Sequence, residues 1–296
     1  MKIFDCFMYF DEELVVDVRL NTLNEFVDYF VIVESKFTHK GDQRELKFNH
    51  KRFERFKDKI IYLIFDKEPE KIETIKLDDT EEEKSRKYIF NAAYRENGQR
   101  DYIEQGLVNA EENDIILISD ADEIPNLSGI DFDKVDEKII LFQQDMFYYK
   151  FNLHLPGLIW TGTKACKKKY LSSPQWLRNI KDRKYPFFRV DTIFSKIKYT
   201  NVKIFYNGGW HFTNIKNAEE IKYKLKSYLH HREFDVNPLT VDQIDKIINN
   251  KKAIYNLNVD KSVNKIGSGN DLENFDIKKL PEYILNNKEN FKEWID

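Results

Sequence analysis

Cysteine, glycine and proline are all scarce in this sequence. Its 296 residues include two cysteines, Cys6 and Cys166, together with ten glycines and seven prolines. Two cysteines argue against the disulfide framework that stabilises many secreted domains, and they favour a reducing, cytoplasmic setting. There is also no internal repeat and no long Gly/Ser linker, which favours a single domain of the size of an enzyme.

The sequence also lacks a long hydrophobic segment. No run approaches the roughly 18 apolar residues of a membrane-spanning helix. The first residues, MKIFDCFMYF, include Asp5 and lack a small-residue cleavage site, so they predict a strand and not a signal peptide. We therefore expect a cytoplasmic protein with at most peripheral membrane contact. The net charge of −3 provides no basic footprint for nucleic acid, which we exclude as a partner.

Core-forming residues, by contrast, are abundant. Hydrophobic residues make up 41% of the chain and aromatic residues 15%, which is typical of a globular protein. Short apolar runs, several of them β-branched, predict strands that are covered on both faces. Helices are expected at 11–24 and at 80–108, where Thr80 and Glu83 form a capping-box pattern. Strands are expected at residues 2–8, 29–35, 59–65, 114–120 and 138–144, with shorter ones at 187–194 and 202–206.

The order of these segments predicts the fold class and the domain organisation. Alternating strands and helices indicate an α/β protein with a mostly parallel central sheet flanked by helices. Beyond residue 217 the chain becomes helical and rich in lysine. We expect one domain at residues 1–235 and a helical C-terminal extension at 236–296 packed on it.

One motif does not fit a simple buried strand. The segment IILISDADEIP (115–125) runs from four aliphatic residues straight into three carboxylates. Asp120 and Asp122 then lie at the carboxyl end of a strand, where open α/β sheets bind ligands, and alternate residues of an extended segment can share one target. Two close carboxylates repel unless a proton or a cation lies between them.

A hard divalent cation such as Mg²⁺ or Mn²⁺ prefers such oxygen ligands and often brings phosphate oxygens with it. The motif therefore indicates a metal–diphosphate site. The simpler alternative is that Asp120 caps a turn and Asp122 is solvated.

Four sequence blocks together resemble a known enzyme family. They are VDYFVIVESKFTHKGDQRELKF (27–48), YRENGQRDYI (94–103), DADEIP (120–125) and GGWHFT (208–213). In this order they are similar to glycosyltransferase family 17, the β-1,4-mannosyl-glycoprotein β-1,4-N-acetylglucosaminyltransferases, whose animal members add the bisecting GlcNAc of N-glycans. The resemblance implies a GT-A-like nucleotide-sugar fold at residues 1–235, UDP-GlcNAc as donor and inversion at the anomeric carbon. The expected absence of a membrane anchor, a stem and paired cysteines favours another glycan or glycoconjugate as acceptor.

The resemblance also implies roles for particular residues at the donor site. Asp120 and Asp122 would bind the metal, and His211 would join them, because a histidine late in a GT-A domain often completes such a site. Around them we expect donor contacts from Glu34, Thr38, Arg100, Asp101, Trp210 and Lys224. Glu34 could instead be a cap or ion-pair partner, Trp210 a core residue, and Lys224 a solvated helix residue. His39 is interpreted as a surface residue and the basic run at 164–170 as a solvated face.

Inversion requires a carboxylate that accepts the proton of the acceptor hydroxyl. Glu123, next to the expected metal ligands, is one candidate, and a positioning role beside Arg100 is its alternative. Asp145 and Asp191 are the other candidates for the base, and the sequence does not choose among the three. Two other functions remain open at this point, namely a sugar nucleotidyltransferase and a glycan-binding module without catalytic activity.

Overall fold

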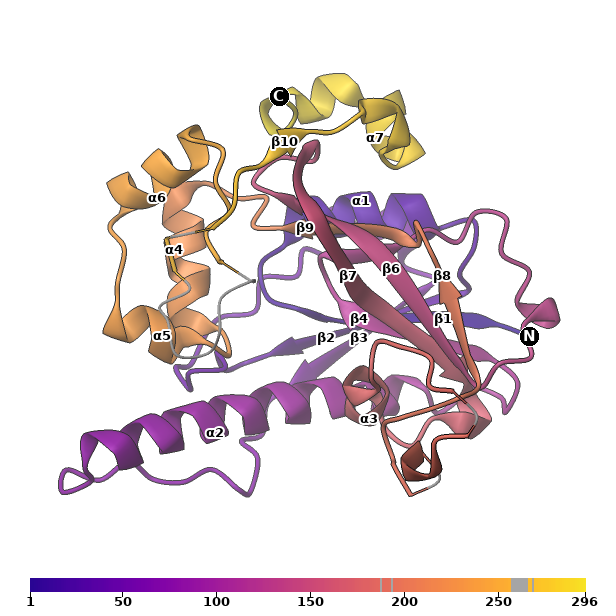
Figure 1. Cartoon of the computed structure of the whole chain (residues 1–296), viewed down its shortest axis with the longest axis horizontal. Coiled ribbons are helices and arrows are strands. Elements are labelled where there is room, and N and C mark those ends of the chain that lie inside the picture. The colour runs from indigo at the N-terminus through magenta and orange to yellow at the C-terminus, as the bar shows by residue number, and fades with distance from the viewer. Residues whose placement is uncertain (187, 193, 257–265, 268) are drawn as a thin grey trace.

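The computed structural model describes residues 1–186, 188–192, 194–256, 266–267 and 269–296. Within these residues the chain forms a mixed ten-stranded sheet flanked by helices (Figure 1). Its main strand order is β3-β2-β1-β4-β7-β6-β9-β5, with β8 and β10 joined to β6 and β7. The predicted α/β class with a mostly parallel sheet and flanking helices is therefore confirmed.

The first half of the sheet is entirely parallel. It consists of β1 (Ile3–Tyr9), β2 (Tyr29–Ser35), β3 (Ile60–Phe65) and β4 (Ile115–Asp120), close to the four strands predicted there. Strand β1 lies between β2 and β4 in parallel register, so the carboxyl ends of these strands meet at one edge of the sheet. The acidic motif follows β4 at this edge.

The second half of the sheet is mixed. It contains β5 (Glu123–Pro125), β6 (Ile139–Tyr148), β7 (Leu153–Lys167), β8 (Val202–Phe205), β9 (Gly209–Thr213) and β10 (Glu273–Asn274). Strand β7 runs antiparallel to both β4 and β6, and β9 runs parallel to β6. The strand predicted at 187–194 is wrong in its described part, because Val190–Thr192 form a 3-10 turn; residues 187 and 193 lie outside the described residues.

Helices cover both faces of the sheet. Helix α1 (Glu13–Leu23) packs on one face and contacts α7 (Glu282–Asn286), while α2 (Glu81–Asp101) and α3 (Pro174–Asn179) lie on the other (Figure 1). The capping box predicted for α2 is confirmed, since the Thr80 hydroxyl accepts from the Glu83 amide at 3.2 Å and Glu83 accepts in return from the Thr80 amide at 2.8 Å. Short 3-10 segments occur at Glu54–Phe56, Tyr102–Gly106, Phe132–Lys134, Lys168–Tyr170, Val190–Thr192, Ile277–Lys279 and Lys288–Trp294.

A third group of helices lies at one end of the sheet. Helices α4 (Ala218–Ser227), α5 (His231–Val236) and α6 (Val241–Asn249) surround a separate apolar cluster with the ends of β6 and β7. Beyond residue 235, α6 packs on α4, β10 pairs with β7, and α7 contacts α1. The domain division at residue 235 stays a prediction. In the described part of the chain, no helix combines the length and apolar character needed to cross a lipid bilayer.

Candidate active site

The acidic turn (residues 120–123) connects β4 to β5 at the edge of the sheet. Arg19 of α1 fixes its backbone from below, donating to the carbonyl oxygens of Asp120 at 3.0 Å and Glu123 at 2.8 Å. Arg19 is itself fully buried in an ion pair with Asp5, with nitrogen–oxygen distances of 2.6 and 2.7 Å. A buried charge needs such a partner, and the guanidinium's remaining N–H groups hold the turn in one conformation.

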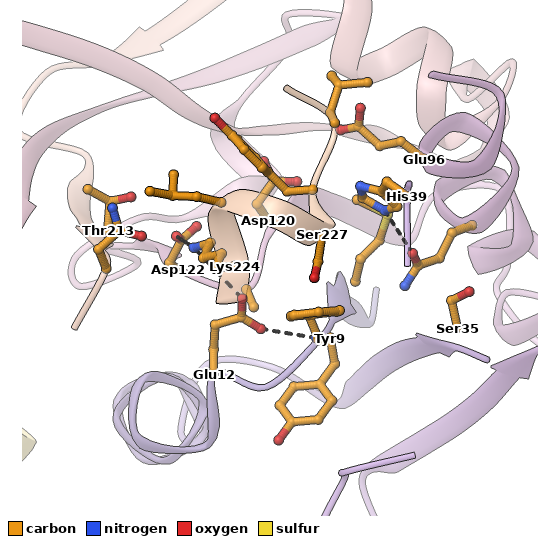
Figure 2. A pocket seen from close by; sticks show the side chains of 18 of the residues that line it. Tyr9, Glu12, Ser35, His39, Glu96, Asp120, Asp122, Thr213, Lys224 and Ser227 are labelled. Carbon is orange, nitrogen blue, oxygen red and sulfur yellow. Dashed lines mark hydrogen bonds and ion pairs between the residues drawn. The ribbon is translucent and has the colours of Figure 1, made fainter. Parts of the chain in front are cut away.

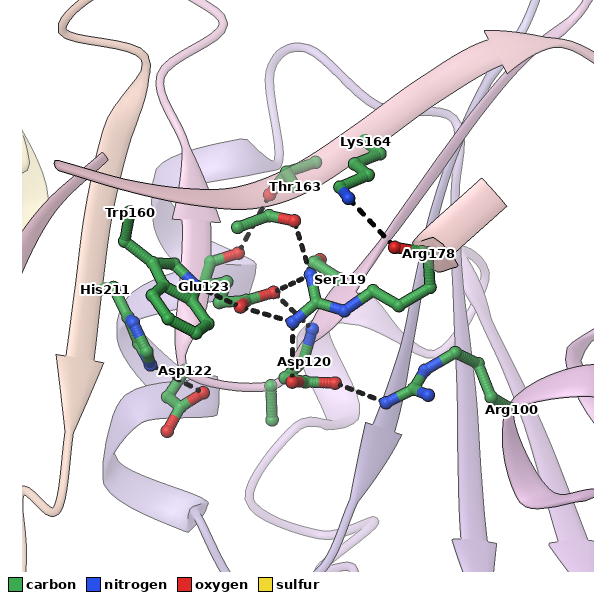
Figure 3. Close-up of polar contacts among 12 residues, drawn as sticks. Arg100, Ser119, Asp120, Asp122, Glu123, Trp160, Thr163, Lys164, Arg178 and His211 are labelled. Atoms are coloured by element: carbon green, nitrogen blue, oxygen red, sulfur yellow. Dashed lines mark hydrogen bonds and ion pairs between the residues drawn. The ribbon is translucent and has the colours of Figure 1, made fainter. Parts of the chain in front are cut away.

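Two arginines hold the carboxylate of Asp120 (Figure 3). Arg100 of α2 donates to its Oδ1 at 3.0 Å, and Arg178 of α3 donates to its Oδ2 at 2.9 Å. The side chain keeps 36% of its surface exposed. Burial raises the pKa of Asp120, but the two guanidinium groups outweigh it and lower the pKa to about 2. Asp120 is therefore ionised and already neutralised by protein cations.

Glu123 has no free oxygen in this arrangement. Arg178 contacts both of its carboxylate oxygens, at 2.8 and 2.6 Å, and the Trp160 indole N–H donates to Oε1 at 2.6 Å. The amide of Asp120 adds a bond to Oε2 at 2.8 Å, and the side chain is only 1% exposed. A base must reach the acceptor hydroxyl, so this geometry favours the alternative role, in which Glu123 positions Arg178 and the acidic turn.

Asp122 is held more loosely and on the other side of the turn. Its Oδ1 lies 3.5 Å from His211 Nε2, and its Oδ2 lies 3.4 Å from Lys224 Nζ. Burial raises the pKa of Asp122, but Lys224 and His211 hold it below its ordinary value. Conversely, burial lowers the pKa of Lys224, but Asp122 and Glu12 outweigh that and hold it above its usual range.

His211 reaches this position because β9 approaches β5 very closely. The register pairs Glu123 with His211, and the Phe212 amide donates to the carbonyl oxygen of Asp122 at 2.8 Å. A Cβ on Gly209 would lie 2.1 Å from the Ile124 carbonyl oxygen, and its φ is +135°, so only glycine fits there. The imidazole packs on the Trp160 ring at 5.3 Å, and its Nδ1 is buried without a hydrogen-bond partner among the described residues.

A pocket opens beside the carboxylate of Asp122 (Figure 2). It has a volume of about 240 Å³ and lies beyond the carboxyl ends of β1, β2 and β4, between α2 and α4. Asp120, Asp122, His211 and Lys224 all line it, so the structure brings together these four predicted site residues. Arg100 lies behind Asp120 and is 2% exposed.

Other predicted donor contacts have structural partners instead. Glu34 is fully buried and accepts from Arg44, from two backbone amides and from the Tyr62 hydroxyl at 2.7 Å, as its ion-pair alternative predicted. The Thr38 hydroxyl accepts from the amides of residues 41 and 42 and closes the loop after β2. Asp101 accepts from the Gln175 amide at 2.8 Å and joins α2 to α3.

Three further candidates lie away from the pocket. Trp210 and Asp145 face a separate groove, and the Trp210 indole donates to the Lys279 carbonyl oxygen at 2.9 Å. Asp191 is paired with Arg189 and Lys198 in an exposed 3-10 turn. None of the three predicted bases is among the described residues that line the pocket. Their assignment as bases stays a prediction that this geometry does not favour.

Several residues of the site could not be recognised from the sequence. Arg178 and Trp160 belong to no motif, although Arg178 contacts two of the three carboxylates. His39, which the sequence predicts to be a surface residue, lines the pocket, and its Nε2 lies 3.2 Å from Gln99 Oε1. Burial lowers the pKa of His39. Lys164 is also buried and donates to two backbone carbonyl oxygens, which corrects the solvated-face interpretation for that residue.

The fit to a divalent cation is partial. Among the described residues, no cluster of three or more His, Cys, Asp or Glu side chains has the spacing of a complete metal site. The predicted ligands Asp120, Asp122 and His211 line one pocket but do not form such a cluster, and arginines hold Asp120. Of the predicted ligands, Asp122 and His211 face each other in the pocket, with Oδ1 3.5 Å from Nε2. Mg²⁺ is commonly bound through one or two carboxylates together with substrate phosphates, so these two donors suit a cation shared with a diphosphate.

Comparison with known proteins identifies the family of this chain. The β-1,4-mannosyl-glycoprotein 4-β-N-acetylglucosaminyltransferases of Homo sapiens, Rattus norvegicus and Mus musculus are each 25% identical to the chain over 228 residues. The match covers 72% of this chain and 40% of each relative, so the chain spans less than half the length of these proteins. A sequence model described as glycosyltransferase family 17 matches residues 1–295. The family predicted from the sequence is confirmed, and the chain belongs to glycosyltransferase family 17.

Proposed function

We propose that this chain transfers N-acetylglucosamine from UDP-GlcNAc to a hydroxyl group of a glycan, with inversion at the anomeric carbon and with a divalent cation. The observation that carries the proposal is the position of Asp122, Lys224 and His211, in a pocket beyond the carboxyl ends of parallel strands, within a glycosyltransferase family. This is where open α/β sheets bind nucleotides. The parallel half of the sheet is compatible with a GT-A-like fold, which we propose with it.

The pocket offers suitable partners for both ends of a nucleotide sugar. Lys224 carries a positive charge that can turn from Asp122 to a diphosphate, since its contact of 3.4 Å is long for a charged hydrogen bond. At the other end, His39, Gln99 and Glu96 provide hydrogen-bonding groups for a ribose or a base. Arg44 lines the same wall, and Glu34 holds its guanidinium in place. This gives Glu34 an indirect part in donor binding.

A divalent cation would be bound by Asp122 and His211 and would neutralise charge that develops on the leaving diphosphate. Asp120 would act beside it as the carboxylate that fixes Arg100 and Arg178. Because Asp120 and Glu123 pair with these arginines, Lys224 and the cation would supply the positive charge that an anionic donor requires.

For the acceptor hydroxyl we favour Glu12 as the proton-accepting carboxylate. It lines the pocket, and the amides of Phe10 and Asp11 orient its Oε2 at 3.0 and 3.1 Å. Its Oε1 lies 3.8 Å from Lys224 Nζ, and no arginine contact to it occurs among the described residues. Glu12 therefore has a free lone pair facing the space in which the donor would lie, which Glu123 does not have.

Calorimetric titration of Mn²⁺ tests the proposal. Mn²⁺ should bind the UDP-saturated protein more tightly than the free protein, and His211→Ala should weaken that affinity by at least about tenfold, or about 1.4 kcal/mol. His230→Ala, which changes an exposed histidine, is the matched control. Equal Mn²⁺ affinity in wild type and His211→Ala would remove His211 from the cation site.

Turnover separates the enzyme from a glycan-binding module. Release of UDP from UDP-GlcNAc in the presence of mixed glycan acceptors is expected for the enzyme. A protein that binds glycans but neither binds UDP-GlcNAc nor releases UDP would instead be the non-catalytic module.

A further inference from the structure

Two consecutive residues of β9 face two different cavities. His211 lines the pocket described above, whereas Trp210 lines a groove on the other side of the strand, because successive side chains of a strand alternate. The groove lies between α1, the β5–β9 edge and residues 275–287. Its volume of about 1120 Å³ exceeds that of a usual small-molecule pocket, so its dimensions suit an extended ligand.

Asparagine is the most frequent residue type in the described lining of this groove. An amide has two donors and an acceptor, so it can match a hydroxyl group, which is donor and acceptor at once. Asn21, Asn126, Asn286 and Asn287 use part of this capacity in hydrogen bonds to the protein. Asn207 lies in the turn before β9, and Asn286 lies on α7. The six asparagines of the lining are Asn21, Asn24, Asn126, Asn207, Asn286 and Asn287.

Aromatic rings form the apolar part of the lining. Trp210 is half-buried, and the hydrogen bond from its indole N–H to Lys279 fixes the orientation of the ring. Phe275 and Tyr283 add two more rings from the C-terminal segment. Flat rings of fixed orientation suit the apolar C–H faces of pyranose sugars, because they bury apolar area at little cost in side-chain entropy.

The charges of the lining cancel. Three carboxylates and three cationic side chains contribute to it, namely Glu25, Asp145, Glu282, Arg55, Lys278 and Lys279. A balanced lining favours a neutral ligand over a phosphorylated one or a nucleic acid. The donor pocket differs in this respect, since its lining contains four carboxylates, Glu12, Glu96, Asp120 and Asp122, against two basic side chains, Arg44 and Lys224.

From amides, fixed rings and balanced charge we infer that this groove binds a neutral oligosaccharide, at a site separate from the donor pocket. The groove holds the body of a glycan through several sugar rings and does not contain the reacting groups. The C-terminal segment at 275–287 thereby becomes part of a glycan-binding surface. This inference goes beyond the proposed transfer reaction, since it requires neither UDP nor a metal ion.

Saturation-transfer NMR on the full chain tests the groove with two probes, N-acetylchitotetraose and a linear mannopentaose. At least one should receive saturation, and saturating UDP with Mn²⁺ should leave that signal unchanged. Trp210→Ala should weaken binding by about tenfold or more. Asn207→Gly should weaken it several-fold while keeping the fold, because the φ of Asn207 is +53°, which glycine adopts without strain.

Lys224→Met is the matched control in the donor pocket and should bind the oligosaccharide as wild type does. The inference is overturned if neither probe receives saturation, if UDP competes with the probe, or if Asn207→Gly binds as wild type with unchanged circular dichroism. An unglycosylated polypeptide, such as carboxymethylated lysozyme, could bind more tightly than either oligosaccharide and lose that binding in Trp210→Ala. This result would overturn the choice of ligand. If the groove binds an oligosaccharide but the protein shows no turnover of UDP-GlcNAc, the inference about the groove holds and only the transferase proposal is refuted.

Discussion

Asp120 and Asp122 lie two residues apart in one turn, but their surroundings differ in kind. On the arginine side (Asp120, Glu123, Arg100 and Arg178) the contacts are short, between 2.6 and 3.0 Å, and every carboxylate oxygen has an arginine partner. On the lysine side (Asp122, His211 and Lys224) the contacts are 3.4 and 3.5 Å long. The arginine side is built from planar, bidentate groups, whereas the lysine side uses a single point charge and an imidazole.

This difference indicates different roles for Asp120 and Asp122, although both belong to one motif. A saturated arginine network is costly to disturb, because removing one partner leaves a buried charge. A lysine and an imidazole at long distance can exchange their carboxylate for a ligand at smaller cost. We therefore expect the arginine side to determine stability and the lysine side to determine turnover.

The largest expected effect is the loss of stability in Arg178→Met. This change leaves Glu123 buried without its cation, which should lower the free energy of unfolding by about 3–5 kcal/mol, measured by urea denaturation. Adding Glu123→Gln to Arg178→Met removes the unpaired charge, keeps an acceptor for Trp160, and should recover more than half of the loss.

Arg183→Met serves as the control for this experiment. Arg183 is an exposed residue that contacts the ring of Tyr185, so its replacement should change stability by at most about 0.5 kcal/mol. A loss in Arg178→Met no larger than in Arg183→Met would show that the network does not stabilise the fold.

The second expected effect separates the two acids by turnover. Asp122→Asn should reduce kcat by about 10²–10³-fold, the usual consequence of removing one group that stabilises a transition state, while its unfolding free energy stays near that of wild type. Asp120→Asn should reduce kcat less and stability more, because it loosens Arg100 and Arg178. Both variants keep the size and shape of the side chain, so they are matched. Equal losses of kcat in the two variants would break the comparison.

The smallest expected effect is on the pH dependence of stability. The pKa of Asp120 in the folded protein is lowered to about 2, so its contribution is fully present above the unfolded pKa of about 3.9 and is lost as pH falls through the folded value. Since the side chain is 36% exposed, solvent screening reduces this contribution to about 1 kcal/mol. Urea denaturation with a chelator between pH 5 and pH 2 should show a flatter decline for Asp120→Asn; parallel curves would contradict the assignment.

The sequence was sufficient for the parts of the site that local pattern determines. Short apolar runs mark β1 to β4, and an acidic group directly after one of them places Asp120 and Asp122 at the ligand-binding edge. His211 was found through its glycine-rich block. The same reasoning could have separated Trp210 from His211, because neighbours on a strand face opposite sides.

Other parts depend on contacts between distant segments. Arg178 lies on a helix of six residues, far along the chain from its carboxylates, and no local feature distinguishes it from the exposed arginines nearby. Strand β7 was not predicted because Pro156 and Gly157, the latter with a φ of +75°, interrupt its pattern, and so Trp160 was not considered. The sequence also predicted a cation between Asp120 and Asp122, and it could not reveal that arginines from two other helices neutralise Asp120.

Arg19 gives the acidic turn a further property. Its guanidinium joins α1 and β1 to the backbone of residues that follow a hundred positions later, with bonds to Asp5 and to the carbonyl oxygens of Asp120, Ala121 and Glu123. The turn therefore cannot open as a local fluctuation, since opening it would leave the buried guanidinium of Arg19 without these hydrogen-bond acceptors. It belongs to the same cooperative unit as the parallel half of the sheet and lasts as long as that unit stays folded. The surface loops can therefore rearrange around an incoming substrate while the acidic turn keeps its conformation.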